Sequence, residues 1–397
     1  MTSPVSSTPQ HVALGPARTF LAILSLGLGS FASVTAEFLP VGVLPEVADS
    51  FGVTAGSAGL MMTLPGIFAA ISAPGVMLVA GQMDRRLILL ILSAILIAAC
   101  GISAGAGTFA ALLVGRALVG VSLGAFWAMA LAVATRLVPP ERSQKATAAV
   151  FAGVTAAMIL GVPLGNFVAA HSSWRGAFIA AGGIALIAMI LQISVLPKVP
   201  GKGSLKFDGL IAATTSPEAR RSMLMISLVF AAHFGAYTYL APLLHEAAIK
   251  PAGITYVLLG YGVAGFLSTF VTSHFVGRSV KYSLAMAKAM LLIPLGVMPL
   301  LLFSPSLEIA LVMVWGMAWG ALPLCLNLWN QQAARGGLEA KSAAFTFTTQ
   351  VAIAAGSSAG GVIVDSAGVG ATFWVAAGAV AVSLGVLGVA RPLPQRS

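Results

Sequence analysis

Long apolar stretches alternate with short polar gaps along almost the whole chain. A helix needs roughly 20 apolar residues to cross a bilayer, because each residue adds 1.5 Å along the axis. The pattern predicts twelve transmembrane helices, over residues 17–45, 55–80, 87–105, 108–135, 146–170, 176–196, 222–246, 253–277, 282–303, 308–334, 342–364 and 370–390.

The longest polar gap, residues 197–221, divides these stretches into six plus six. It is rich in Pro, Gly and basic residues, which is typical of an exposed linker. We therefore expect an all-α membrane protein with two pseudo-symmetric six-helix bundles, 17–196 and 222–391. Residues 1–16 and 392–397 are expected to be tails, the first of them disordered. A six-plus-six division is typical of transporters, which bind substrate between two halves that rock.

The charged residues give the orientation. Only 8% of the residues are Asp, Glu, Lys or Arg and 58% are hydrophobic, which excludes a soluble globular protein. Of the 21 Lys and Arg residues, 17 lie in one alternate set of gaps, and the other set holds only Arg175 and Lys250. Basic loops stay in the cytoplasm, so both termini and the linker are predicted to be cytoplasmic. The net charge of +10 follows from this asymmetry. Because no basic stripe with interleaved aromatics accompanies it, we expect no nucleic-acid partner.

Ionisable residues inside the predicted spans are the first candidates for function, because each costs free energy unless it is paired or faces water. Glu37 and Arg116 both lie roughly 12 Å below the outer edge of their spans, so the two side chains could meet. Such a carboxyl is suited to carry protons, and a static buried pair or a hydrogen-bonded neutral acid is the alternative. His233 lies nearer the midplane. Its side chain either makes a hydrogen bond within the protein or takes part in proton transfer or substrate binding. Lys288 is expected to extend toward the cytoplasm.

Aromatic and amide side chains gather in several spans. A cavity lined by such groups suits an uncharged solute that has a flat ring or hydroxyl groups, although hydrogen bonds between helices would explain the same residues. The predicted cavity residues are Phe38, Trp127, Tyr237, Tyr239, Trp319, Asn327, Asn330 and Gln350. No catalytic constellation and no metal-binding cluster accompany them, so we expect neither an enzyme nor a cofactor.

Several motifs resemble those of the major facilitator superfamily, in particular its twelve-span drug:proton antiporters and, among these, the bacterial sugar and purine-nucleoside efflux branch. The resemblance covers about residues 17–390. The matching segments are Thr35–Pro40, Gly115-Arg116 with Gly120 and Gly124, Gly161–Gly165, Trp174-Arg175, Tyr237–Pro242, and Gln350 with Gly360-Gly361 and Asp365.

The resemblance implies roles for some of these residues. Arg116 matches a fourth-span arginine implicated in coupling, and Glu37 matches an acidic first-span position of the branch. The fifth-span antiporter motif is matched by Gly161, Pro163 and Gly165, with Val162 interrupting the usual Gly-Pro pair. The cytoplasmic gating motif is degraded, and Asp84, Arg85 and Arg86 are the residues left to form that gate.

These observations predict proton-coupled efflux of a small, uncharged solute, such as a sugar or nucleoside, by alternating access. Export of amphiphilic antibiotics is the alternative, and a passive channel or a membrane sensor is the alternative from another class. The resemblance implies a location in the bacterial inner membrane, and we expect a monomer whose partners are the solute, protons and the lipid bilayer, with the proton gradient as its energy source.

Overall fold

The computed structural model describes residues 14–79, 81–200, 214–276, 278–334 and 338–390. In this part of the chain the regular structure is entirely helical. Most of the predicted first tail, the middle of the predicted linker and the whole last tail lie outside the described residues.

The helices follow the predicted spans. In the first half they are α1 (Pro16–Phe51), α2 (Ala55–Ala58), α3 (Leu60–Val79), α4 (Arg85–Ala104), α5 (Phe109–Arg136), α6 (Ser143–His171) and α7 (Trp174–Val195). In the second half they are α9 (Pro217–Tyr237), α10 (Leu240–Glu246), α11 (Pro251–Phe275), α12 (Val280–Val297), α13 (Pro305–Ala333), α14 (Leu338–Ala367) and α15 (Val369–Val389). Eleven of those described are long and apolar enough to cross a membrane, and α9 with α10 makes a twelfth span bent by 44°. The prediction of an all-α, twelve-span fold is confirmed.

The bend between α9 and α10 has a local cause. Pro242 has no N–H, so the carbonyl of Thr238 loses its helical donor and the helix is interrupted there. The hydroxyl of Thr238 donates to the carbonyl oxygen of Phe234 at 2.6 Å and lies 3.0 Å from the hydroxyl of Ser357 on α14. These side-chain bonds hold the broken span against its neighbour, as polar groups inside a membrane require.

The two halves repeat one packing pattern. In the first half α1 packs on α5, α6 and α7, and in the second half α9 packs on α13, α14 and α15. Glycines mark the common register: Gly120 lies against Pro65 as Gly316 lies against Tyr261, and Gly124 lies against Ala69 as Gly320 lies against Gly265. One offset in residue number relates all four pairs, which matches α3 and α5 with α11 and α13 residue by residue. The same offset relates the left-handed residues Gly52, after α1, and Ala248, after α10, so it also matches α1 with α9 and α10.

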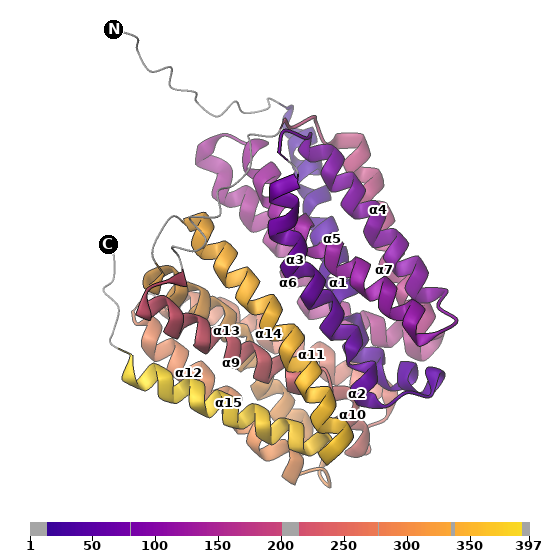
Figure 1. Ribbon diagram of the computed structural model, residues 1–397, viewed down its shortest axis with the longest axis vertical. Helices are drawn as coiled ribbons and strands as arrows, with labels where there is room; N and C mark the ends of the chain where they lie inside the picture. Colours follow the sequence, from indigo (N-terminus) through magenta and orange to yellow (C-terminus); the bar gives the residue numbers. More distant parts are fainter. Residues whose placement is uncertain (1–13, 80, 201–213, 277, 335–337, 391–397) are drawn as a thin grey trace.

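The halves meet along α3 and α14 on one side and along α6 and α11 on the other. Their long axes form an open angle in Figure 1, with α2 and α10 near its vertex; α1 begins and α15 ends on the side where it opens. We call that side the terminal face and the side of α2 and α10 the opposite face.

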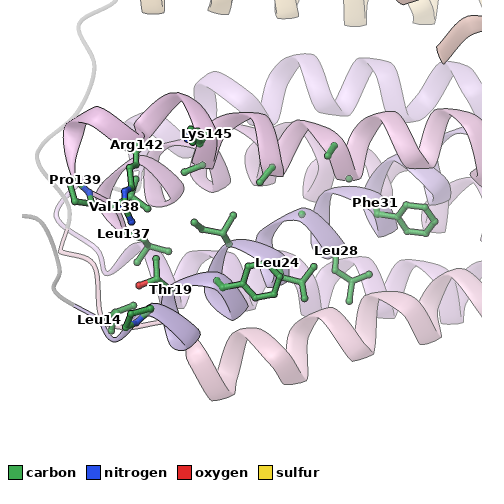
Figure 2. A pocket seen from close by; sticks show the side chains of 18 residues that line it. Leu14, Thr19, Leu24, Leu28, Phe31, Leu137, Val138, Pro139, Arg142 and Lys145 are labelled. Atoms are coloured by element: carbon green, nitrogen blue, oxygen red, sulfur yellow. The ribbon is translucent and has the colours of Figure 1, made fainter. Parts of the chain in front are cut away.

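A cavity of about 690 Å³ opens on the terminal face, between α1 and α6. Its wall is mostly apolar, with Arg142 and Lys145 near its outer end and Phe31 at its inner end (Figure 2). Phe31 lies two turns before Phe38 on the same face of α1. The cavity therefore leads from the terminal face toward the level of Glu37.

Candidate functional site

Arg116 on α5 is fully buried and ties two other helices together. Its Nη1 and Nη2 atoms donate to the carbonyl oxygens of Ala36 and Glu37 on α1, at 2.6 and 2.7 Å, and its Nε donates to that of Met61 on α3, at 2.8 Å. The guanidinium group is thus surrounded by backbone oxygens of two neighbouring spans.

Two prolines explain why these oxygens need a donor. In a continuous helix the carbonyl of Ala36 would accept from residue 40, and that of Met61 from residue 65. Both positions are proline, at Pro40 in α1 and Pro65 in α3, and proline has no N–H to donate. Arg116 supplies the missing donor to both helices, so one side chain stabilises two proline kinks at the same level of the first half.

Glu37 is 4% exposed, and its carboxyl group faces the other half. The amide Nε2 of Gln350 on α14 lies 3.5 Å from Glu37 Oε1, which is a long hydrogen bond. Arg116 and Glu37 do meet, as their depths predicted, but the contact is to the backbone and no carboxylate–guanidinium ion pair forms between these two residues. A static pair through the carboxyl group, which we gave as the alternative to proton transfer, is not observed, because the backbone carbonyls freed by the prolines accept the guanidinium hydrogens.

The glycines of the fifth-span motif set the position of α1 beside Glu37. A Cβ added at Gly161 would lie 3.0 Å from Thr35, and a Cβ added at Gly165 would lie 3.0 Å from Leu39. These contacts lie on either side of Glu37 in sequence. Pro163 is an interior residue of α6, and its ring leaves the carbonyl of Ile159 without a helical donor; the backbone of α11 approaches α6 closely at Ile159.

An aromatic cluster lies across from Glu37. Phe38 stacks on Phe234 of α9, with ring centroids 5.3 Å apart and planes 14° apart. By the correspondence between the halves, Glu37 and Phe38 match His233 and Phe234, so the Phe38–Phe234 stack joins equivalent residues. His233 is therefore the counterpart of Glu37 in the second half.

His233 is 1% exposed and is held by two tryptophans one turn apart on α13. The ring of Trp319 stacks on it with centroids 3.4 Å apart, and Trp315 Nε1 donates to His233 Nδ1 at 3.0 Å. On its other side His233 stacks with Tyr237, at 5.0 Å, and Tyr237 stacks in turn with Tyr261 of α11, at 5.0 Å. Sequence analysis does not select Tyr261, but its ring belongs to this cluster. By the correspondence between the halves, Tyr261 is the equivalent of Pro65.

The predicted cavity residues divide into two groups. Phe38, Trp319 and Gln350 lie around the Glu37 carboxyl and the aromatic cluster, and Tyr237 lies inside that cluster. Asn327 is partly buried and accepts from Gln331. The remaining residues are used elsewhere.

Asn330 is buried and its side chain links α9 to the start of α14. Its Oδ1 atom accepts from the hydroxyl of Ser222, and its Nδ2 atom donates to the backbone carbonyl of Lys341. Trp127 packs on Phe151, and its Nε1 has no partner among the described residues. The structure thus gives Asn330 a role between helices in place of the predicted one in the cavity.

Tyr239 is also displaced from the predicted cavity, to a seal at the opposite face. Its hydroxyl donates to the carbonyl of Ser357 at 3.0 Å and lies 3.5 Å from that of Gly56. Beside it, Asp365 at the end of α14 accepts from the hydroxyl of Thr54 at 2.7 Å and from the N–H of Gly56 at 2.9 Å. These bonds join α2 to α14 and close the halves together at this face.

The predicted gate residues lie at the terminal face within the first half. Asp84 caps α4 and accepts from the N–H groups of Arg86 and Val199, at 3.0 and 2.8 Å. Arg86 also donates to the carbonyl of Ile193 at 2.7 Å, and the N–H of Arg85 donates to that of Val199 at 2.9 Å. In this arrangement these contacts hold the beginning of the linker rather than the second half.

Two further charges are buried in helices of the second half. Lys288 is fully buried in the middle of α12, and its Nζ donates to the carbonyl of Ser383 on α15 at 3.0 Å. Our expectation that this side chain extends toward the cytoplasm is wrong. Glu308 is fully buried in the first turn of α13. The apolar runs could not reveal the burial of either residue, because Lys288 is covered by α15 and Glu308 lies at the edge of a predicted span.

With this arrangement in place, comparison with known proteins decides the family. The sequence profile of the Major Facilitator Superfamily matches residues 26–350. The chain belongs to the major facilitator superfamily. Members are membrane transporters, and the expectation that the chain is not an enzyme is confirmed.

Two relatives in the superfamily are purine ribonucleoside efflux pumps NepI of Salmonella. The pump of Salmonella paratyphi B is 32% identical over 338 residues, which are 84% of this chain and 85% of the pump. The pump of Salmonella typhimurium is 31% identical over the same lengths.

Solved structures show the same superfamily fold. A mutant of the nucleoside transporter NupG has a TM-score of 0.74 at 12% identity, covering 92% of this chain and 99% of NupG. A bacterial homolog of the human lysosomal transporter Spinster, in an inward-facing and unoccupied conformation, has a TM-score of 0.69 at 14% identity, with 95% and 96% covered. The human organic anion transporter MFSD10 has a TM-score of 0.64 at 17% identity, covering 94% of this chain and all of MFSD10.

Proposed function

We propose that this transporter exports a purine nucleoside or a similar uncharged solute in exchange for protons, by alternating access of the bundles 17–196 and 222–391. The chemistry of the site supports an uncharged, flat solute, because aromatic faces and a neutral amide surround one carboxyl group. The likeness to purine ribonucleoside efflux pumps, at 31–32% identity, supports the substrate class.

The observation that carries proton coupling is the isolation of the Glu37 carboxyl. Its strongest candidate counter-ion, Arg116, is bonded to three backbone carbonyls, and its hydrogen-bond partner Gln350 belongs to the half that must move. A buried carboxylate without an ion pair is costly, and a proton removes that cost. Rocking the halves changes the distance to Gln350 and the access of water, so the carboxyl can exchange its proton with one side at a time.

The orientation completes the proposal. Because basic residues are concentrated at the terminal face, we place that face in the cytoplasm, with both termini, and the protein in the bacterial inner membrane. The cavity between α1 and α6 is then open to the cytoplasm while Asp365 and Tyr239 seal the outer side, an arrangement ready to load solute for export. The proton gradient supplies the energy, and no cofactor is needed.

Everted membrane vesicles test this function. Vesicles that contain the protein and are energised by a gradient acidic inside should accumulate radiolabelled inosine or adenosine above equilibrium, and a protonophore should abolish the accumulation. Equal levels inside and outside, with and without the gradient, would rule out antiport of nucleosides. Uptake of amphiphilic antibiotics in place of nucleosides would support the alternative substrate class.

A further inference from the structure

The orientation of His233 fixes where its proton sits. An indole N–H can only donate, so the bond from Trp315 Nε1 requires a lone pair on His233 Nδ1. The ring is therefore neutral in this arrangement, with its hydrogen on Nε2. Stacking against Trp319 and Tyr237 holds the plane of the ring and hence the direction of that N–H.

This N–H has no hydrogen-bond partner among the described residues, although His233 is 1% exposed. Tyr261 belongs to the same aromatic cluster and is 5% exposed, and its buried hydroxyl also has no hydrogen-bond partner in that part of the chain. Buried polar groups are nearly always hydrogen-bonded, so an unpaired buried hydroxyl beside a histidine N–H that makes no hydrogen bond calls for an explanation. A bound molecule with acceptor atoms would satisfy them.

The correspondence between the halves gives these groups a place in transport. His233 occupies in α9 the position of Glu37 in α1, and the next residues of each helix, Phe38 and Phe234, stack across the boundary. One half thus presents a carboxyl and the other a fixed N–H donor, on either side of an aromatic stack. A solute between the halves can contact both.

We propose that His233 and Tyr261 form the subsite for the heteroaromatic ring of the solute, at which the His233 Nε2–H donates to a ring nitrogen. This proposal rests on the proposed export of a purine nucleoside, and it gives His233 a role in binding rather than in carrying protons. Trp315 is the positioning residue, because its bond to Nδ1 keeps the hydrogen on Nε2.

Binding of adenosine and its 1-deaza, 3-deaza and 7-deaza analogues to the purified full-length protein tests the subsite. Each analogue lacks one ring acceptor. One of them should bind wild type about five- to tenfold more weakly than adenosine, the value of a single neutral hydrogen bond. His233→Asn, whose amide cannot reach the Nε2 position, should bind adenosine and that analogue equally weakly. His233→Gln places an N–H near Nε2 and should retain the preference.

Two further variants apply the same test without altering His233. Trp315→Phe should reduce the preference for adenosine over that analogue, because Nδ1 can then take the hydrogen, and Tyr261→Phe should weaken adenosine binding severalfold. The control Trp374→Phe removes an indole bond to Gly296 at an exposed position and should change nothing.

Two results would overturn the subsite while leaving export intact. One is a ratio of adenosine affinity to analogue affinity that stays at the wild-type value in His233→Asn and Trp315→Phe. The other is equal binding of all three analogues by wild type. Wild-type protein that binds no nucleoside would instead overturn the proposed function, and the subsite with it. The proposal would also be contradicted if His233→Gln and His233→Asn both lost gradient-driven export but still bound nucleoside. That result would make His233 a proton carrier.

Discussion

Arg116 contacts Glu37 through the backbone: its Nη2 atom donates to the carbonyl oxygen of Glu37 at 2.7 Å, and the carboxyl group of Glu37 is left to face the other half. This division separates two roles that an ion pair would have merged. The arginine stabilises a kinked helix, and the carboxyl remains available for a proton.

The first prediction concerns the stability of the kinks. Arg116→Ala should lower the free energy of unfolding by about 3 kcal/mol or more, because it leaves the buried carbonyls of Ala36 and Met61 without donors. Replacing Pro40 and Pro65 by Ala restores a helical N–H to each carbonyl. In that background the same substitution should cost about 1–2 kcal/mol less, measured by thermal unfolding in detergent.

Glu37→Gln provides the contrast for this double-mutant cycle. If an ion pair with the carboxyl were the main role of Arg116, the cost of Arg116→Ala would fall in the Glu37→Gln background and stay constant in the proline variants. We predict the reverse: the cost of Arg116→Ala falls in the proline variants and stays constant in the Glu37→Gln background.

The second prediction concerns the packing of α1 on α6. Gly161→Ala places a Cβ about 3.0 Å from the Thr35 hydroxyl and 3.2 Å from its Cα, so α1 must shift beside Glu37. Export should fall at least severalfold, with a loss of stability of about 1–3 kcal/mol from overpacking. Gly183→Ala on α7 is the matched control, because a Cβ there meets nothing within 4 Å. Equal activity of the two variants would remove the packing argument.

The third prediction concerns the seal at the opposite face. Asp365→Ala removes an acceptor from the Thr54 hydroxyl and the Gly56 N–H, and each bond contributes about 0.5–1.5 kcal/mol. The population open at that face should rise about tenfold or more. A thiol reagent reacting with Ala58→Cys, at a fully buried position of α2, would report this in a background with Cys100 and Cys325 replaced by Ala.

Ser366→Ala should serve as the control, because the Ser366 hydroxyl bonds only within its own helix, to the carbonyls of Val362 and Ile363. Labelling that is equally slow in Asp365→Ala and Ser366→Ala would show that the seal does not depend on Asp365.

Much of the fold could be predicted from the sequence, since span length and hydrophobicity are local properties. The meeting of Glu37 and Arg116 was also accessible, because equal distance from a span end implies equal depth. The atoms through which Arg116 makes this contact could not be predicted. Pro40 and Pro65 are visible in the sequence, and chemistry alone shows that each position lacks an N–H. Which side chain reaches the freed carbonyls depends on how three helices pack.

The same limit, that the sequence does not show which helix packs opposite a polar side chain, applies to three further residues. They are Lys288, which is buried, Tyr239, which forms the seal, and Asn330, which bonds between helices. Each residue has a polar group inside or near a span, and such a group can bond a neighbouring helix or face a cavity at similar cost. The choice is made by the helix opposite: α15 for Lys288, α2 and α14 for Tyr239, and α9 and α14 for Asn330. The offset that matches Glu37 with His233 could have been found in the sequence from the paired glycines.

Proton release on solute binding tests the central claim most directly. Purified wild-type protein in weakly buffered detergent should release protons, up to one per molecule, when adenosine or inosine is added, because solute and proton compete at Glu37. Glu37→Gln should bind the nucleoside and release none, and Glu246→Gln, at an exposed position on α10, should behave as wild type. Undiminished release by Glu37→Gln would contradict the account.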